Sequence, residues 1–352
     1  MIVIRARNVQ QILPEALYQL ERRGVDRESR NGPVKVFPEP ATSVYERPCE
    51  RVMFWPDRDC NPFFHLMESL WMLAGRNDVE FVTRYVKTMA NFSDDGETFH
   101  GAYGHRWINH FGFNQLDEII KALSENPDDR RCVLQIWDAT TDLGKQGKDF
   151  PCNIGAHFQV THEGRLDMTV FNRSNDVVWG AYGANAVHFS VLQEYVASRL
   201  QRPVGVYRQV SDNLHAYHDT LAKVAHLSAE AADPMGCRVV PDPYATGQVR
   251  PFPLMTVDPA RWQEDLEQFF VNPYSAFNDP FFNSVVKPMQ AAHDEYRLRT
   301  GEGRYDAAIA AMRDVAASDW RKAGEEWLQR RKANYVARLK RAQDDGVDYE
   351  QR

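Results

Sequence analysis

One thiol of this chain stands in surroundings suited to covalent chemistry. Cys152 follows Phe150 and Pro151, and Arg173 comes about twenty residues later. A cysteine attacks only as the thiolate, and a nearby guanidinium favours that anion. The sequence therefore predicts that Cys152 is a covalent catalyst and that Arg173 favours its thiolate.

Several arginines point to an anionic substrate. Arg130 and Arg131 enter an apolar run, and Arg173 is followed by Ser174. Guanidinium forks and a hydroxyl suit a phosphate monoester. Alone, an Arg-Arg pair is more often a solvated surface, so the prediction depends on these segments meeting at one site.

Four polar residues downstream are suited to a heterocycle and a sugar. Asp176 and Asn185 offer directional hydrogen bonds, although each alone is more often a cap or turn residue. His215 and Tyr217 are two apart in an extended run, so both rings face the same side of a strand. They suit a sugar hydroxyl, and a hydrogen-bonded core pair is the alternative interpretation.

The elements that must position these residues read as an α+β protein. Apolar residues at helical spacing from 63 to 74 predict a helix that Gly75 ends, and Glu68 lies on its apolar face. A carboxylate there is either paired structurally or held in a site. Residues 132–137 predict a buried strand, residues 156–161 and 166–171 a hairpin, and residues 187–200 an apolar helix.

Composition sets the class of protein. The chain has 352 residues, 43% of them hydrophobic, and a formal net charge of -7, which argues against non-specific nucleic-acid binding. Five scattered cysteines without a CxxC pair predict free thiols in a reducing compartment, and no spacing of a zinc site occurs. No signal peptide or membrane span is evident, so we expect a cytoplasmic protein that binds neither membrane nor nucleic acid.

The composition changes once along the chain. From residue 294 it turns to Ala, Arg, Lys, Glu and Asp at helical spacing, which predicts a helical extension with a solvated outer face. We therefore expect a catalytic domain over residues 1–293 and a helical C-terminal extension over residues 294–352.

In order and spacing, these segments resemble the thymidylate synthase superfamily, which includes the pyrimidine nucleotide hydroxymethylases. The resemblance runs from about residue 30 to residue 217. The segments that carry it are Arg30-Asn31-Gly32, Glu68-Ser69-Leu70-Trp71, Tyr103-Gly104-His105-Arg106-Trp107, Arg130-Arg131, Phe150-Pro151-Cys152, Arg173-Ser174-Asn175-Asp176 with Gly180 and Asn185, and His215-Ala216-Tyr217.

The resemblance implies a three-layer α+β fold on a large mixed sheet, and a homodimer in which Arg130 and Arg131 serve the partner's site. It implies that Cys152 adds to C6 of a pyrimidine nucleoside monophosphate, whose C5 then takes a one-carbon unit from 5,10-methylenetetrahydrofolate. No metal is expected. The implied catalytic residues are Cys152, Glu68, Tyr103 and Asp176; the substrate-binding residues are Arg30, Arg130, Arg131, Arg173, Ser174, Asn185, His215, Tyr217 and Asn153; the cofactor-binding residues are Asp176, Gly180 and Met89.

Three departures from the family pattern concern the product. Synthases shield the one-carbon unit with tryptophan, whereas residues 88–92 contain none. The chain ends in polar residues 348–352 where synthases have an apolar closing peptide, and Asn153 replaces the histidine that usually follows the nucleophile. These departures favour water addition, and hence a hydroxymethyl product, over the methyl product of a thymidylate synthase.

The base and the class of activity have alternatives. Asn185 favours uracil and thus dUMP, but one extra residue between Gly180 and Asn185 makes Ala184 a second counterpart and leaves dCMP or CMP open. Two alternatives belong to other classes of protein: a catalytically silent nucleotide-binding scaffold, and a cysteine protease or amidase. Intact Cys152, Glu68 and Tyr103 argue against a scaffold, and the arginines have no purpose in a protease. A hydroxymethylase would suit the cytosol of a bacterium or of a phage-infected host.

Overall fold

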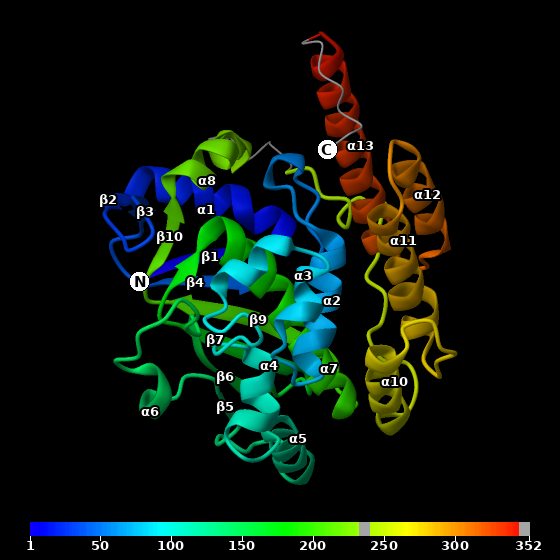
Figure 1. The fold of residues 1–352 in the computed structure, drawn as a ribbon. Coiled ribbons are helices and arrows are strands. Elements are labelled where there is room, and N and C mark those ends of the chain that lie inside the picture. The colour runs from blue at the N-terminus through cyan, green and yellow to red at the C-terminus, as the bar shows by residue number, and fades with distance from the viewer. Residues whose placement is uncertain (232–239, 345–352) are drawn as a thin grey trace. The chain divides into compact units, whose positions relative to one another are not determined.

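The computed structural model describes residues 1–231 and 240–344, which belong to two compact units (Figure 1). The first unit comprises residues 1–58 and 67–243, and the second comprises residues 59–66 and 244–352. The division expected at 293/294 therefore falls inside the second unit.

Ten strands of the first unit form two mixed sheets. The six-stranded sheet has the order β1-β4-β9-β7-β6-β5, and the four-stranded sheet has the order β2-β3-β10-β8. In the larger sheet β1 pairs parallel with β4 and β7 parallel with β9, while the other pairs are antiparallel. The strands are β1 Ile2–Ala6, β2 Val25–Arg27, β3 Val34–Val36, β4 Ala41–Tyr45, β5 Val133–Gln135, β6 Asn153–Val160, β7 Leu166–Asn172, β8 Asn175–Asp176, β9 Val204–Ser211 and β10 Leu214–Tyr217.

The large sheet has one buried face and one partly open face. Alternate residues of β7 and β9 are buried, and those between them, such as Phe171, Val206 and Val210, are only half-buried. Helix α7 packs on β7 and β9, and α1 packs on β1 and β4. This period-2 pattern is what the predicted hairpin of β6 and β7 requires, and Gly164 turns it at φ 77°.

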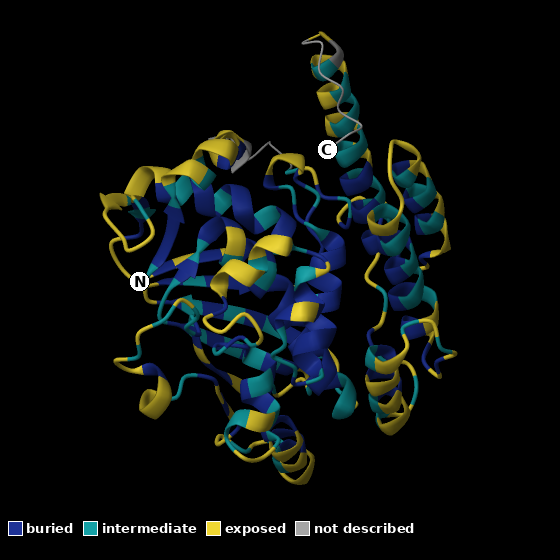
Figure 2. Ribbon diagram, viewed as in Figure 1, coloured by how far each residue is buried: buried dark blue, intermediate teal, exposed yellow. Residues whose placement is uncertain are grey.

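The helices of the first unit include two that bear directly on the site. Helix α7 is buried along most of its length (Figure 2). Helix α2 starts in the second unit and continues into the first, and Gly75 at φ 66° follows it as predicted. The helices are α1 Val9–Arg23, α2 Pro62–Leu73, α3 Val79–Thr83, α4 Tyr103–His105, α5 Gln115–Glu125, α6 Ala139–Asp142, α7 Asn185–Arg199, α8 His218–Val224 and α9 Ser228–Ala231.

The second unit is helical. It contains α10 Pro259–Val271, α11 Lys287–Leu298, α12 Gly303–Ala311 and α13 Ser318–Asp344. Its core includes Trp262, Phe282 and Trp327, and buried Asp279 accepts the backbone amides of Thr256 and Val257. Helical spacing after residue 294 thus correctly predicted helices, although the helical unit begins earlier. Within the described residues, no helix is both long and apolar enough to cross a membrane.

Candidate active site

A cavity of about 1610 Å³ in the first unit brings most of the predicted residues together. It exceeds the range of about 300–1,000 Å³ that one drug-sized ligand needs, so there is room for two molecules. The predicted residues that line it are Arg30, Glu68, Met89, Tyr103, Cys152, Arg173, Ser174, Asp176, Asn185, His215 and Tyr217.

Arg173 braces the loop that carries Cys152. Its backbone amide donates to the Cys152 carbonyl oxygen at 3.0 Å, and its Nε donates to the Pro151 carbonyl oxygen at 3.0 Å. Its Nη2 lies 4.0 Å from the Cys152 Sγ, and its guanidinium lies over the Trp137 ring. The cation is therefore placed to stabilise negative charge on the sulfur.

Burial nevertheless governs the protonation of this thiol. Burial raises the pKa of Cys152 above its ordinary value, and Arg173 offsets this only in part. Asp149 raises the pKa of Cys152 further, and Arg30 lowers it. The prediction that Arg173 favours the thiolate is right in direction, but it omitted burial, and Cys152 is mainly a thiol at neutral pH.

We expect Cys152 to react slowly with iodoacetamide at pH 7 and about tenfold faster for each pH unit until beyond about pH 9, because only the thiolate reacts. Arg173 lowers the pKa of Cys152, so Arg173→Ala should raise that pKa, reduce the thiolate fraction and slow the reaction further. Peptide mass spectrometry separates the thiols. Burial raises the pKa of Cys49 to about 12, so Cys49 should react more slowly still. If the rate of alkylation of Cys152 does not rise above pH 7, the raised pKa of Cys152 is contradicted.

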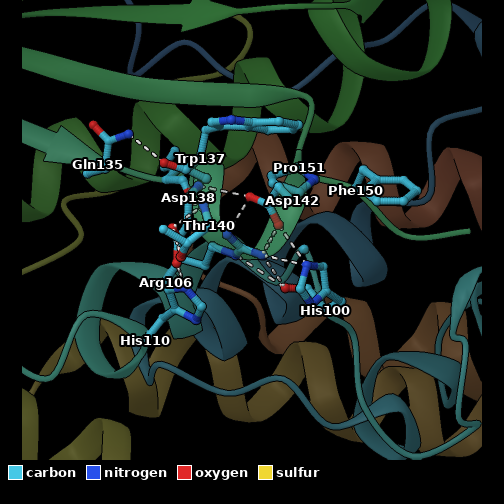
Figure 3. A network of polar contacts seen from close by, with 12 residues as sticks. His100, Arg106, His110, Gln135, Trp137, Asp138, Thr140, Asp142, Phe150 and Pro151 are labelled. Carbon is cyan, nitrogen blue, oxygen red and sulfur yellow. Dashed lines mark hydrogen bonds and ion pairs between the residues drawn. The ribbon is translucent and has the colours of Figure 1, made fainter. Parts of the chain in front are cut away.

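A buried ion-pair cluster supports the segment before Cys152 (Figure 3). Arg106 donates Nη1 to Asp142 Oδ2 at 2.7 Å and Nη2 to Asp142 Oδ1 at 2.8 Å, and His100 Nε2 lies 2.7 Å from Asp142 Oδ1. Burial raises the pKa of Asp142, but the Arg106 hydrogen bonds and other donors outweigh it and leave the pKa lowered. The His100 ring meets the Phe150 ring edge-on, so the cluster reaches the catalytic loop. Loss of one partner of such a pair typically costs about 3–5 kcal/mol.

Glu68 is both paired and within the site, so both interpretations of its position hold. Its Oε2 lies 3.1 Å from Nε2 of His188, and both side chains are largely buried. Glu68 comes from α2 and His188 from α7, and both line the cavity. A carboxylate and an imidazole in contact form a pair that can pass a proton.

Tyr103 and Asp176 are the other two residues that were predicted to be catalytic, and both line the cavity. Burial raises the pKa of Tyr103 well above its ordinary value, and a hydrogen bond with the Cys152 backbone opposes this, so the hydroxyl stays protonated beside the thiol. Asp176 Oδ1 accepts the Trp179 amide, while buried Oδ2 has no hydrogen-bond partner among the described residues. Burial also raises the pKa of Asp176. Its free oxygen suits an N–H donor of a ligand.

Ala184 and Asn185 both line the cavity, and of the two only Asn185 has a polar side chain. The π-helical segment Val177–Ala184 leaves helical geometry at Tyr182 and Gly183. Helix α7 then starts at Asn185, whose amide lines the cavity. Asn185 Nδ2 donates to Asn175 Oδ1 at 3.1 Å.

The residues predicted to bind the sugar and the phosphate include His215, Tyr217 and Arg30, which line the same cavity. His215 and Tyr217 lie on β10 with ring centroids 5.4 Å apart, and His215 Nδ1 lies 2.8 Å from Asn213 Oδ1. Arg30 lines the cavity from the loop between β2 and β3. The cavity thus offers cations, a carboxylate and ring donors on separate elements.

Four predicted residues lie outside the cavity lining. Arg130 precedes β5, and exposed Arg131 pairs with Asp129 at 2.7 Å. Gly180 lies behind the site, and Asn153 is fully buried with an amide that has no hydrogen-bond partner among the described residues. Their roles stay predictions. The polar end at residues 348–352 lies outside the described residues.

Several further residues of the cavity lining were not predicted. Among them, His188 lies on a helix so apolar that it reads as core, Arg27 ends strand β2, and Lys148 lies in the loop between α6 and β6. The signal for His188 was its spacing three after Asn185, which places both on one helix face. Among the described residues no group of three metal-ligating side chains is arranged around a common point.

Comparison with known proteins identifies the class. The thymidylate synthase family profile matches residues 57–236. The thymidylate synthase of T4 phage shares the fold with a TM-score of 0.52 and 19% identity, over 62% of this chain and 80% of that one. The chain belongs to the thymidylate synthase family, and the predicted α+β fold is confirmed.

Its similarity to individual members is more specific. A deoxyuridylate hydroxymethyltransferase of Pseudomonas phage M6 is 60% identical over 99% of this chain and all of its own length. One of Bacillus phage SP01 is 41% identical over about half of each chain. A putative thymidylate synthase of Methanothermobacter marburgensis is 37% identical over 36% of this chain and 54% of its own.

Proposed function

We propose that this protein is a folate-dependent hydroxymethyltransferase that acts on C5 of dUMP. One observation carries the proposal: a single cavity holds the Cys152 thiol, the Glu68 carboxylate and the Asn185 amide. These are a nucleophile, a proton acceptor and a group that reads a base edge. The full-length similarity to the Pseudomonas phage M6 protein supports the same substrate and product.

Binding of the nucleotide uses the groups around the thiol. Arg173, Ser174 and Arg30 line the cavity and suit a 5′-phosphate. His215 and Tyr217 suit the sugar hydroxyl. The Asn185 carbonyl oxygen accepts from N3–H of uracil, and its amide nitrogen donates to O4.

The covalent step uses Cys152. Its sulfur forms a bond with C6, the electron pair of the 5,6 double bond moves toward O4, and C5 becomes nucleophilic. Because the thiol is protonated in the free protein, its proton must leave as the nucleotide binds. Arg173, 4.0 Å from the sulfur, stabilises the thiolate at that moment.

The residues also fit the co-substrate, 5,10-methylenetetrahydrofolate, which supplies the one-carbon unit when bound. The cavity has room for a second molecule beside the nucleotide. The partnerless Asp176 Oδ2 suits the N–H donors of a pterin ring, and Met89 and Trp179 offer apolar surface in the same cavity.

The surroundings of C5 support water rather than hydride as the final reactant. The segment Lys87–Phe92 contributes Met89, Asn91 and Phe92 to the cavity and contains no tryptophan, and Phe92 is exposed. The Glu68–His188 pair can take the proton of a water that adds to the exocyclic carbon. The absence of tryptophan from this segment supports hydration, while Trp71, Trp137 and Trp179 line the cavity from other segments.

The proposal includes a homodimer. Phe171, Val206 and Val210 lie half-buried on the second face of the large sheet beside the ion pair of Arg208 and Asp167, and this partly open face suits packing against a second copy. Arg130 and Arg131 lie just before the edge strand β5, and the exposed side chain of Arg131 is accessible to a second copy. The phage origin of the relatives supports action in the cytosol of an infected bacterium.

A product assay tests the activity. The protein is incubated with 5,10-methylenetetrahydrofolate and either dUMP, dCMP or CMP, with mass spectrometry of the nucleotide and absorbance detection of dihydrofolate. We expect 5-hydroxymethyl-dUMP without dihydrofolate. A methyl product with equimolar dihydrofolate would make the chain a thymidylate synthase, and no product from any nucleotide would support a binding role. Sedimentation of the same preparation reports the oligomeric state.

A further inference from the structure

The Asn185 amide on its own does not distinguish uracil from cytosine. Uracil presents N3–H and O4, a donor and an acceptor, whereas cytosine presents N3 and N4–H₂, an acceptor and a donor. A rotation of the amide by 180° exchanges its oxygen and nitrogen and would suit cytosine equally well. Selection between the bases therefore requires a contact that fixes the positions of the amide oxygen and the amide nitrogen.

A chain of buried hydrogen bonds behind the site fixes that orientation. It starts at the carbonyl oxygen of Ala181, which can only accept, and Gln209 Nε2 donates to it at 3.1 Å. Gln209 Oε1 must then be the acceptor for Asn175 Nδ2, at 2.9 Å. Asn175 Oδ1 is left to accept Asn185 Nδ2, at 3.1 Å. Each amide thus dictates the orientation of the next.

The surroundings leave little freedom for the chain to reverse. Asn175 is 2% exposed and Gln209 is fully buried. A Cβ atom on Gly180 would lie 2.5 Å from Asn175 Oδ1, so the backbone is pressed against that oxygen. Tyr45 donates to the Ala181 oxygen at 2.7 Å and accepts from Gln209 Nε2 at 3.0 Å, which supports the same polarity.

The consequence appears at the cavity. With its nitrogen bound to Asn175, Asn185 keeps its carbonyl oxygen and one amide hydrogen for the ligand, and that oxygen has no hydrogen-bond partner among the described residues. A rotated Asn185 would put its oxygen against Asn175 Oδ1, so two buried acceptors would face each other without a proton.

We propose that Asn175, held by Gln209, is a positioning residue that makes the site select uracil over cytosine. It touches no ligand and acts through Asn185. The proposal rests on the proposed function only in that the site takes a pyrimidine nucleotide. It assigns base selection to the buried amide chain and not to Asn185 alone.

Equilibrium binding of dUMP and dCMP and turnover of both nucleotides test this. Wild-type protein should prefer dUMP by at least about tenfold in both measurements. Asn175→Ala frees the Asn185 amide to rotate, and the preference should fall about 10- to 100-fold, mainly through tighter binding and faster turnover of dCMP relative to dUMP. Gln209→Leu should act in the same direction through Asn175, and it serves as the second variant if Asn175→Ala does not fold.

Ser43→Ala is the matched control. The Ser43 hydroxyl meets the Tyr182 hydroxyl at 2.8 Å in the same buried layer but lies outside the amide chain. It should lower stability without changing the ratio of dUMP to dCMP. If Asn175 has only a structural role, Asn175→Ala should weaken binding of both nucleotides equally. An unchanged ratio of dUMP to dCMP binding would therefore overturn the proposal.

The two proposals fail separately. A protein that hydroxymethylates dUMP and keeps its preference in both variants refutes the role of Asn175 alone. The protein could instead turn over neither nucleotide, bind dUMP in preference to dCMP, and lose that preference in Asn175→Ala. That result would support the role of Asn175 and contradict the proposed enzymatic activity. Equal binding of both nucleotides by the wild-type protein, or binding of neither, overturns the role of Asn175.

Discussion

Cys152→Ser is expected to lower turnover of dUMP by about four orders of magnitude or more, because a serine hydroxyl is far less nucleophilic than a thiolate and Arg173 cannot ionise it. Binding of dUMP should stay within a few-fold of the wild-type value, because Arg173, Ser174 and Asn185 remain in place. The site would then bind its nucleotide without forming the bond to C6.

Denaturing mass spectrometry measures the missing step directly. The wild-type protein, mixed with dUMP and 5,10-methylenetetrahydrofolate and then denatured, should carry an added nucleotide mass on the peptide that contains Cys152. The serine variant should carry none. Cys132→Ser is the matched control, since Cys132 is a buried thiol outside the cavity lining, and it should retain turnover. More than about 1% residual activity in Cys152→Ser would rule out obligatory covalent catalysis.

The gathering of the candidate residues in one cavity was predictable from the sequence because their types are unusual in their positions. A thiol after Phe-Pro and an arginine at a strand end have few structural uses, and period-2 spacing predicted the strands β6, β7 and β10. The extra residue before Asn185 left an ambiguity in the sequence, and Ala184 and Asn185 both line the cavity.

What remained hidden depends on contacts between distant segments. Asp142 and Arg106 are 36 residues apart, and neither has a pattern that predicts a buried pair. The raised pKa of Cys152 follows from burial, which the residue types around it do not reveal. The second unit begins before the change in composition at residue 294, because α10 and part of α11 precede that residue.

His188 shows how a residue that lines the cavity can look like part of the core. Its neighbours on α7 are buried almost throughout, so a lone histidine there reads as a packed side chain. Only the approach of α2 brings Glu68 to 3.1 Å from its Nε2. The pair joins two helices that are more than a hundred residues apart in the chain, and neither helix alone predicts it.

Glu68→Gln is expected to lower kcat by about 10²- to 10⁴-fold with a much smaller change in KM, because glutamine keeps the shape of the side chain but cannot accept a proton. In hydration, a water must lose a proton as its oxygen bonds to the exocyclic carbon. Among the described residues that line this cavity, no other carboxylate is paired with an imidazole. His188→Gln keeps the carboxylate and removes only its partner, so its loss of kcat should be smaller, about tenfold.

Glu194→Gln separates this effect from lost packing. Glu194 is a buried carboxylate on α7 that pairs with Arg51 outside the cavity, and its removal should lower thermal stability while kcat stays within about twofold. Single-turnover kinetics with mass spectrometry of the protein and of the nucleotide follow each variant. If Glu68→Gln releases product as fast as Glu194→Gln does, the proton of the attacking water goes elsewhere, and the Glu68–His188 pair is structural.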